Sequence, residues 1–364
     1  MLTKVHFYGK ISILLFILHA RATRGESSMQ ETPGLVAQDV IEKTSYRIAR
    51  RAYFRVGLGL LLFACLPTLL AYGISLLLSL FAPAVLDLPY ISWIAQVVLM
   101  YGIAFPISFF VIGKPRQPIH PRDGKRFPAL LLLTVFCLLF AMARVGTVIS
   151  NILTVFSRLL LGAFPENPLT EMLSGTPIII IFAVVAVLGP IVEELLLRYA
   201  VMERLLPFGE KSAILFSAVA FGLLHGNFYQ LFYSVGIGLL LGYLYARTRK
   251  VLYPILLHVL FNFLGSVVPL SFAPLIEQLG NGELSLAFFI QNATALAAML
   301  VYLLLQMALP VAGVVLVCVF CKRIHFSPAE LPLGKRAHVR ACLANAGVIL
   351  FAIVACLGLA LSLG

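Results

Sequence analysis

The chain has 364 residues, of which 61% are hydrophobic and only 12% are charged, and its mean hydropathy is +1.01. This composition excludes an ordinary soluble domain, and repeated apolar runs of about 20 residues predict transmembrane helices. The formal charge of +12 indicates a basic membrane face rather than a nucleic-acid partner, because no basic stretch is interleaved with aromatic residues.

The N-terminal residues 1–28 form a separate feature. They have a basic start, a short apolar core and small residues at Ala20 and Ala22, which is typical of a signal peptide. Met29 offers a second start, so residues 1–28 are either a signal or anchor segment or an extension from a mis-assigned start. Residues 29–53 follow as a basic segment, and no candidate functional residue lies before it.

Nine apolar spans are predicted after this segment, and they define an all-α polytopic membrane protein with about eight or nine transmembrane helices. The spans lie near residues 54–82, 91–113, 128–158, 175–206, 212–227, 230–247, 251–269, 291–320 and 343–363. The fifth and sixth are short, and the sequence HGNFYQ between them predicts a buried turn. Gly238 and Gly242 have GxxxG spacing, which predicts close helix packing.

Lysine and arginine gather in every second loop between the spans. The loops near 83–90, 162–174 and 271–284 contain neither residue. The positive-inside rule therefore predicts a cytoplasmic N-terminus and an external C-terminus. Residues 114–126 and 247–250 are expected in the cytoplasm, and residues 271–286 outside it.

Few ionisable residues lie deep in the predicted spans. Glu193 and Glu194 are the acids placed this deep, and His225 and His258 lie in or against apolar stretches without a basic cluster. A charge at membrane depth costs a few kcal/mol or more, so such residues indicate a functional site. The alternative is a buried Glu–Arg pair, with Arg198, that only locks two helices together.

The depths of these residues favour a site. At about 1.5 Å per residue, Glu193 lies roughly 20 Å from the expected cytoplasmic end of its span, His225 roughly 21 Å and Asn262 roughly 18 Å. His258 lies roughly 12 Å from that end. Three helices are thus predicted to bring their polar groups to one buried layer.

Helical phase assigns these residues to faces. His258 and Asn262 lie four residues apart and share a face, as Phe221 and His225 do. Glu194 and Arg198 have the same spacing and are predicted to pair. Glu193 is rotated by about 100° from Glu194, so it is expected to point elsewhere, toward a water molecule and His225.

Three motifs in this order resemble the CPBP family, the group of CAAX prenyl proteases and Abi or bacteriocin-processing proteins. The matches are Glu193, Glu194 and Arg198, then Phe221 and His225, then His258 and Asn262. The resemblance covers about residues 170–270 as a catalytic core, between N-terminal helices over 54–169 and C-terminal helices over 271–364. It implies an intramembrane endopeptidase, with the first glutamate and first histidine at the water and the last histidine and asparagine at the oxyanion.

The chemistry of these side chains agrees with peptide hydrolysis, which needs a base for water, an acid for the leaving amine and donors for the oxyanion. The chain has no HExxH, GxSxG or GxGD motif. Glu193, His225 and His258 are also candidate ligands for zinc, so a metalloprotease stays open beside a metal-free, glutamate-activated water.

The sequence predicts an integral multi-pass protein of a bacterial plasma membrane that acts on a peptide or membrane-protein substrate, with no nucleic-acid partner. Two other classes stay open. A transporter or proton relay would also bury Glu, Arg and His, and a non-catalytic immunity or scaffold protein would keep the same fold. The sequence favours the protease because its set of candidate groups is intact.

Overall fold

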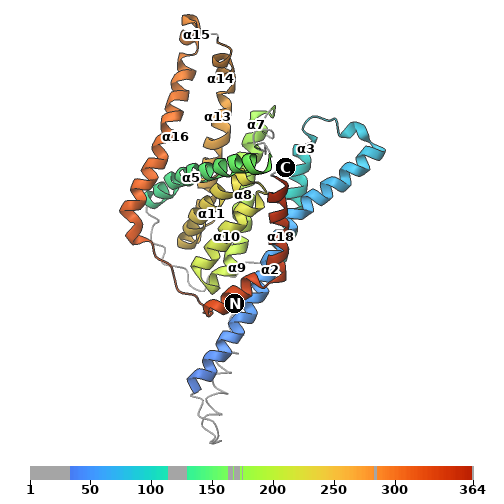
Figure 1. Cartoon of the computed structure of the whole chain (residues 1–364), viewed down its shortest axis with the longest axis vertical. Coiled ribbons are helices and arrows are strands. Elements are labelled where there is room, and N and C mark those ends of the chain that lie inside the picture. The colour runs from blue at the N-terminus through green and yellow to red at the C-terminus, as the bar shows by residue number, and fades with distance from the viewer. Residues whose placement is uncertain are drawn as a thin grey trace, which may run out of the picture.

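The computed structural model describes residues 33–113, 129–162, 167, 173, 175–282 and 285–362. These residues form helices and connecting turns, and none of them lies in a β-strand (Figure 1). Seven helices are long and apolar enough to cross a membrane, and a bent pair over 335–343 and 346–361 can supply an eighth. The prediction of an all-α polytopic membrane protein is confirmed, while the N-terminal residues 1–28 and the loop 114–126 lie outside the described residues.

The first helix is longer than the sequence predicted, and the next two predicted spans lie close to their expected bounds. The helices of the first half are α2 (Pro33–Phe81), α3 (Ile91–Gln96), η2 (Val97–Ala104), α4 (Phe105–Ile112) and α5 (Ala129–Leu161), with the short η1 (Pro83–Val85) after α2. Helix α2 runs back through most of the predicted basic segment 29–53, because Lys and Arg favour helix as well as many apolar residues do. The helix therefore begins before the predicted span 54–82.

The helix that carries the glutamates has an irregular backbone. It comprises α7 (Ile178–Ile180), η3 (Ile181–Leu188), α8 (Gly189–Glu194), η4 (Leu195–Met202), α9 (Glu203–Leu205) and η5 (Leu206–Phe208). Both η3 and η4 are π-helical, so wide turns flank α8 on each side. π-helical turns occur frequently at functional sites.

Helices α10 (Glu210–Leu224) and α11 (Phe228–Thr248) form an antiparallel hairpin. At 15 residues α10 is shorter than the roughly 20 of a typical span, and it is not one of the seven candidate spans among the described residues. A Cβ added to Gly238 would lie 2.8 Å from Cα of Ala218, which confirms the close packing predicted there. The turn itself contains Gly226, whose φ of +65° suits glycine.

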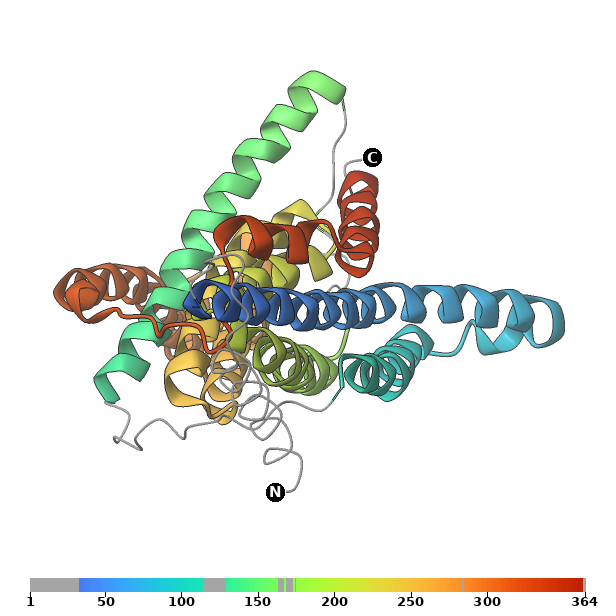
Figure 2. The same ribbon diagram turned by 90° about the horizontal axis from the view of Figure 1, so that it is seen from below.

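The remaining elements complete the bundle. They are α12 (Leu252–Asn262), η6 (Phe263–Val267), α13 (Val268–Ser271), α14 (Ala273–Gly280), α15 (Leu286–Gln291), α16 (Ala293–Phe320), η7 (Cys321–Arg323), α17 (Lys335–Leu343) and α18 (Ala346–Leu361). Helices α17 and α18 lie against α2, as Figure 2 shows. The predicted outer loop at 271–286 contains α14, so it is largely helical.

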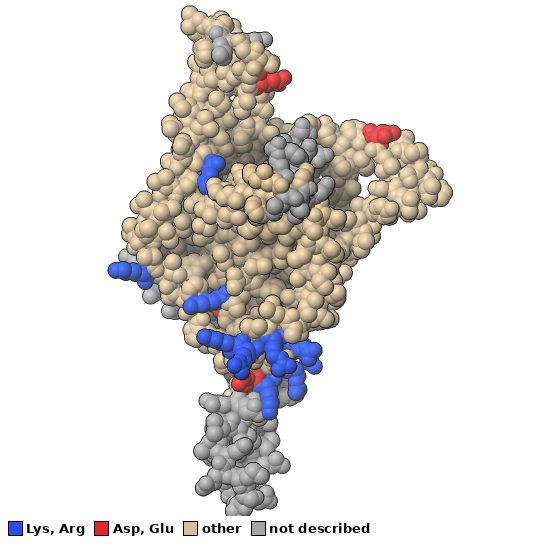
Figure 3. All heavy atoms as spheres, viewed as in Figure 1, with Lys and Arg blue, Asp and Glu red and all other residues tan. Residues whose placement is uncertain are grey.

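Most of the described Lys and Arg side chains gather near the end of the molecule where α2 begins (Figure 3). Arg249 Nη1 lies 2.8 Å from Glu203 Oε1, so the end of α11 is attached to α9. The backbone of Leu331 donates to the carbonyl of Pro207 at 2.8 Å. The gathering of described basic side chains in Figure 3 agrees with the alternation of basic and neutral loops in the sequence.

Candidate active site

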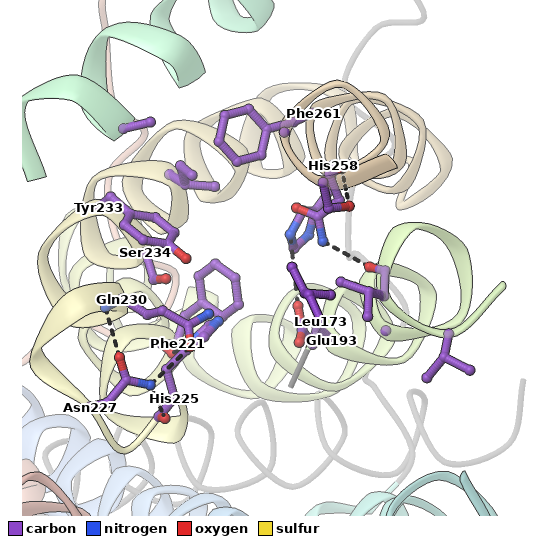
Figure 4. Close-up of a pocket in the computed structure, with 18 of the residues that line it drawn as sticks. Leu173, Glu193, Phe221, His225, Asn227, Gln230, Tyr233, Ser234, His258 and Phe261 are labelled. Carbon is purple, nitrogen blue, oxygen red and sulfur yellow. Dashed lines mark hydrogen bonds and ion pairs between the residues drawn. The ribbon is translucent and has the colours of Figure 1, made fainter. Parts of the chain in front are cut away.

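A cavity of about 790 Å³ lies among the helices and is lined by Glu193, His225, His258 and Asn262 (Figure 4). These side chains come from α8, the turn after α10, and α12. The helices thus bring together residues that lie up to 69 positions apart in the sequence. Most other lining residues are apolar or aromatic, which is typical of a ligand-binding cavity.

Glu194 and Arg198 form a fully buried ion pair. Nε of Arg198 lies 2.9 Å from Oε2 of Glu194, and both side chains are 0% exposed. The four-residue spacing of Glu194 and Arg198 predicted this pairing. Glu194 also uses its second oxygen, because Oε1 lies 3.0 Å from Nδ1 of His258. The carboxylate thus joins the arginine to the histidine of a separate helix, a contact that the sequence analysis missed.

Phe221 packs at the centre of this cluster. Its ring centroid lies 4.9 Å from that of His225 and 5.5 Å from that of His258, both edge to face. The Arg198 guanidinium carbon lies 5.3 Å from the same centroid, within the range of a cation–π contact. Phe221 therefore fixes the relative positions of both imidazoles and the arginine.

His225 caps the end of α10 and is held by the backbone. Its Nδ1 lies 2.8 Å from the carbonyl oxygen of Phe221. Because a carbonyl can only accept, this contact assigns the proton to Nδ1 and leaves a lone pair on Nε2 in the neutral ring. Figure 4 shows His225 beside the cavity, next to Asn227. Asn227 Nδ2 donates to the His225 carbonyl at 2.9 Å and so helps to fix this turn.

Glu193 is partly exposed, in contrast with its neighbour. Its side chain is 23% exposed, and Oε2 lies 3.7 Å from Nε2 of His258. Glu193 and His225 line the same cavity, so the prediction that Glu193 points toward a water and His225 stays a prediction. Helical phase along one helix did not predict the approach of Glu193 to His258.

Asn262 connects α12 to the irregular helix that carries the glutamates. Its Nδ2 donates to the carbonyl of Val185 at 3.0 Å. Val185 lies in the π-helical η3. One N–H of the Asn262 amide is used in this contact, and the second is left for another acceptor.

Sequence reasoning also missed Arg144 and Gln306, which line the cavity from α5 and α16. Nη2 of Arg144 donates to Oε1 of Gln306 at 3.0 Å. A signal for both was present, since each is a strongly polar residue inside an apolar span. Tyr101 and Tyr233 line the same cavity and were not singled out either.

Glu193, His225 and His258 are the candidate zinc ligands that the sequence offers. Within the part of the chain that the structure describes, no three His, Cys, Asp or Glu side chains converge closely enough to hold an ion. Glu193, His225 and His258 share the cavity without forming such a set.

Comparison with known proteins matches residues 175–264 to the family described as "Type II CAAX prenyl endopeptidase Rce1-like". A segment of 108 residues is also 31% identical to a protein of Bacillus subtilis (strain 168) named "Putative membrane peptidase YdiL". That match covers 28% of this chain and 42% of the relative, so the match spans less than half of the relative's length. No solved structure matches the chain.

These matches confirm the resemblance to CPBP-type membrane proteases. The matched segment contains every motif residue from Glu193 to Asn262. The helical bundle with a polar cavity is compatible with that class of protein. Over this core, the chain is similar to Rce1-like endopeptidases, and its other helices lie outside the matched region.

Proposed function

We propose that this chain is an intramembrane endopeptidase that hydrolyses peptide bonds with a water activated by Glu193. The observation that carries the proposal is the convergence of Glu193, His225, His258 and Asn262 on one cavity. The match of residues 175–264 to an endopeptidase family supports the same reaction. Its substrate is a peptide or a membrane protein, which reaches the cavity within the bilayer.

In the proposed first step, Glu193 and His225 hold one water molecule between them. The lone pair on Nε2 of His225 accepts one hydrogen of the water, since Nδ1 is occupied by the Phe221 carbonyl. Glu193 takes the other proton as the water oxygen attacks the carbonyl carbon of the substrate. The protonated Glu193 then gives this proton to the leaving amine as the peptide bond breaks.

His258 and Asn262 are proposed to stabilise the oxyanion. The second N–H of the Asn262 amide can donate to this oxygen while the first stays on the Val185 carbonyl. His258 contributes through Nε2 when that nitrogen carries a proton, because Nδ1 is directed at Glu194. Loss of one such donor typically lowers the rate by about 100- to 1,000-fold.

Glu194 and Arg198 are proposed to position His258 without touching the substrate. Glu194 is 0% exposed and directs its two oxygens at Arg198 and His258. The arginine stabilises the buried carboxylate, and the carboxylate sets the ring orientation of His258. Both residues therefore affect catalysis through the geometry of the histidine.

The proposed mechanism uses no metal, because Glu193 serves as the base and His258 and Asn262 serve as the oxyanion donors. We further propose that the basic end of the molecule faces the cytoplasm of a bacterium, in agreement with the basic loops. The C-terminus is then external, because nine predicted spans separate it from the cytoplasmic N-terminus.

The proposal is tested by purifying the wild-type protein and its Glu193→Gln variant and comparing their cleavage of a randomised peptide library by mass spectrometry. Wild type should generate new termini, and the variant should generate none above background. Glu277→Gln is a matched control, because Glu277 is an exposed acid of α14 away from the cavity wall. Equal cleavage by wild type and Glu193→Gln would overturn the assignment.

A further inference from the structure

The cavity wall carries a cation that the proposed reaction does not use. Among the described residues that line the cavity, Glu193 and Arg144 are the formally charged side chains. Arg144 lies midway along α5, in the apolar span Ala129–Ser157. An arginine at this position is expensive in a membrane, which indicates a function.

The partner of Arg144 is neutral. Its guanidinium donates to Oε1 of Gln306 at 3.0 Å, and the arginine is exposed. No carboxylate of the described residues pairs with it. A guanidinium has five N–H donors, so this single hydrogen bond leaves most of them able to donate to other acceptors. The charge is therefore available to an anion that enters the cavity.

Gln306 is itself held in one orientation. Its Nε2 donates to Oη of Tyr302 at 2.9 Å, which leaves Oε1 to accept from Arg144. The Tyr302 hydroxyl donates onward to the carbonyl of Leu264 at 2.9 Å. This series of contacts connects the guanidinium on α5 to the backbone of η6 and reduces its freedom to turn away.

The same backbone carries the proposed oxyanion residues. Leu264 lies two residues after Asn262, and α12 continues directly into η6. The guanidinium is thus held at a set offset from His258 and Asn262, at the wall of one cavity. A group that binds Arg144 would fix which peptide bond lies beside the oxyanion residues.

We propose that Arg144 binds a carboxylate of the peptide substrate and thereby selects the peptide bond that is cleaved. The inference rests on the proposed endopeptidase function and adds a specificity-determining residue to it. A planar guanidinium matches a carboxylate with two parallel hydrogen bonds, and such charge-assisted contacts are stronger than neutral ones. The carboxylate is either the C-terminus of the peptide or the side chain of an acidic residue.

The test uses one randomised synthetic peptide library in three versions. The first has a free C-terminal carboxylate and no Asp or Glu, the second is amidated and has no Asp or Glu, and the third is amidated with a single Asp. Wild type, Arg144→Gln and Arg144→Lys are compared by kcat/KM on each version. Lys322→Gln is the matched control, since it removes an exposed cation outside the cavity wall.

Wild type should cleave one carboxylate-bearing version about tenfold faster than the neutral version. A preference for the first version identifies the C-terminus, and a preference for the third identifies an acidic side chain. Arg144→Gln should lose the preference, while Arg144→Lys and Lys322→Gln should retain it. If Arg144→Gln does not fold, the wild-type preference and its retention in Arg144→Lys decide the matter.

Equal cleavage of all three versions by wild type would overturn the inference and leave the endopeptidase function intact. Retention of the full preference by folded Arg144→Gln would overturn it as well. By contrast, failure of wild type to cleave any version beyond the Glu193→Gln background would count against the proposed function itself.

Discussion

Removal of the Arg198 guanidinium should cost both stability and activity. Glu194 is 0% exposed, and its recorded partners are Arg198 and His258. Arg198→Ala therefore leaves a buried carboxylate without its cation, which typically costs about 3–5 kcal/mol. The variant also loses the 3.3 Å hydrogen bond from Nη1 to Ser217 and the contact with Phe221.

Glu193→Gln should behave differently, because Glu193 is 23% exposed and lies against His258 rather than a buried cation. The substitution keeps the shape of the side chain and removes a charge beside Glu194. We expect a variant without peptidase activity that is at least as heat-stable as wild type. Both variants are compared by thermal unfolding in one detergent and by peptide cleavage.

The cause of the Arg198 effect can be separated from lost packing with the double variant Arg198→Met and Glu194→Gln. If the uncompensated charge causes the instability, neutralising Glu194 as well should restore much of the melting temperature. Activity should stay low, because His258 loses its carboxylate partner. A fully stable Arg198→Ala, or substantial turnover by Glu193→Gln, would refute this division of roles.

Three further predictions concern topology, metal and packing. Single cysteines at residues 114–126 and 271–286 should be labelled from opposite faces of intact cells, and labelling from one face would mean that the span count is wrong. Chelation that removes all bound metal, verified by elemental analysis, should leave cleavage unchanged, whereas loss of activity restored by stoichiometric zinc would contradict the metal-free reaction. Gly238→Val should destabilise the α10–α11 hairpin by about 1–3 kcal/mol, since the new side chain meets the Ala218 backbone, and an unchanged melting temperature would contradict the close packing.

The sequence predicted the class of fold because apolar runs identify membrane helices with little ambiguity. It could not fix the length of a short helix inside the bundle, because hydropathy alone does not show where such a helix ends. Helix α10 shows this limit: its 15 residues begin at Glu210, and it packs along α11 through Ala218 and Gly238. The basic segment before residue 54 is likewise helical, because α2 begins at Pro33.

Within the site, spacing along one helix predicted contacts on that helix and little beyond it. The pairing of Glu194 with Arg198 follows from their four-residue separation. The contact between Glu194 and His258 depends on how α8 and α12 are rotated against each other, which no single-helix pattern contains. For the same reason, the sequence did not predict the contact between Glu193 and His258.

The two adjacent glutamates can have separate roles because one residue of rotation places them in different surroundings. Glu194 directs its oxygens at Arg198 and His258 and is closed to solvent, so it has no free oxygen with which to hold a water. Glu193 is turned by about 100° and reaches the cavity, where a water or a substrate carbonyl can approach it. A buried cation beside one carboxylate thus makes that residue structural, and the lack of such a pairing leaves the other free for proton transfer.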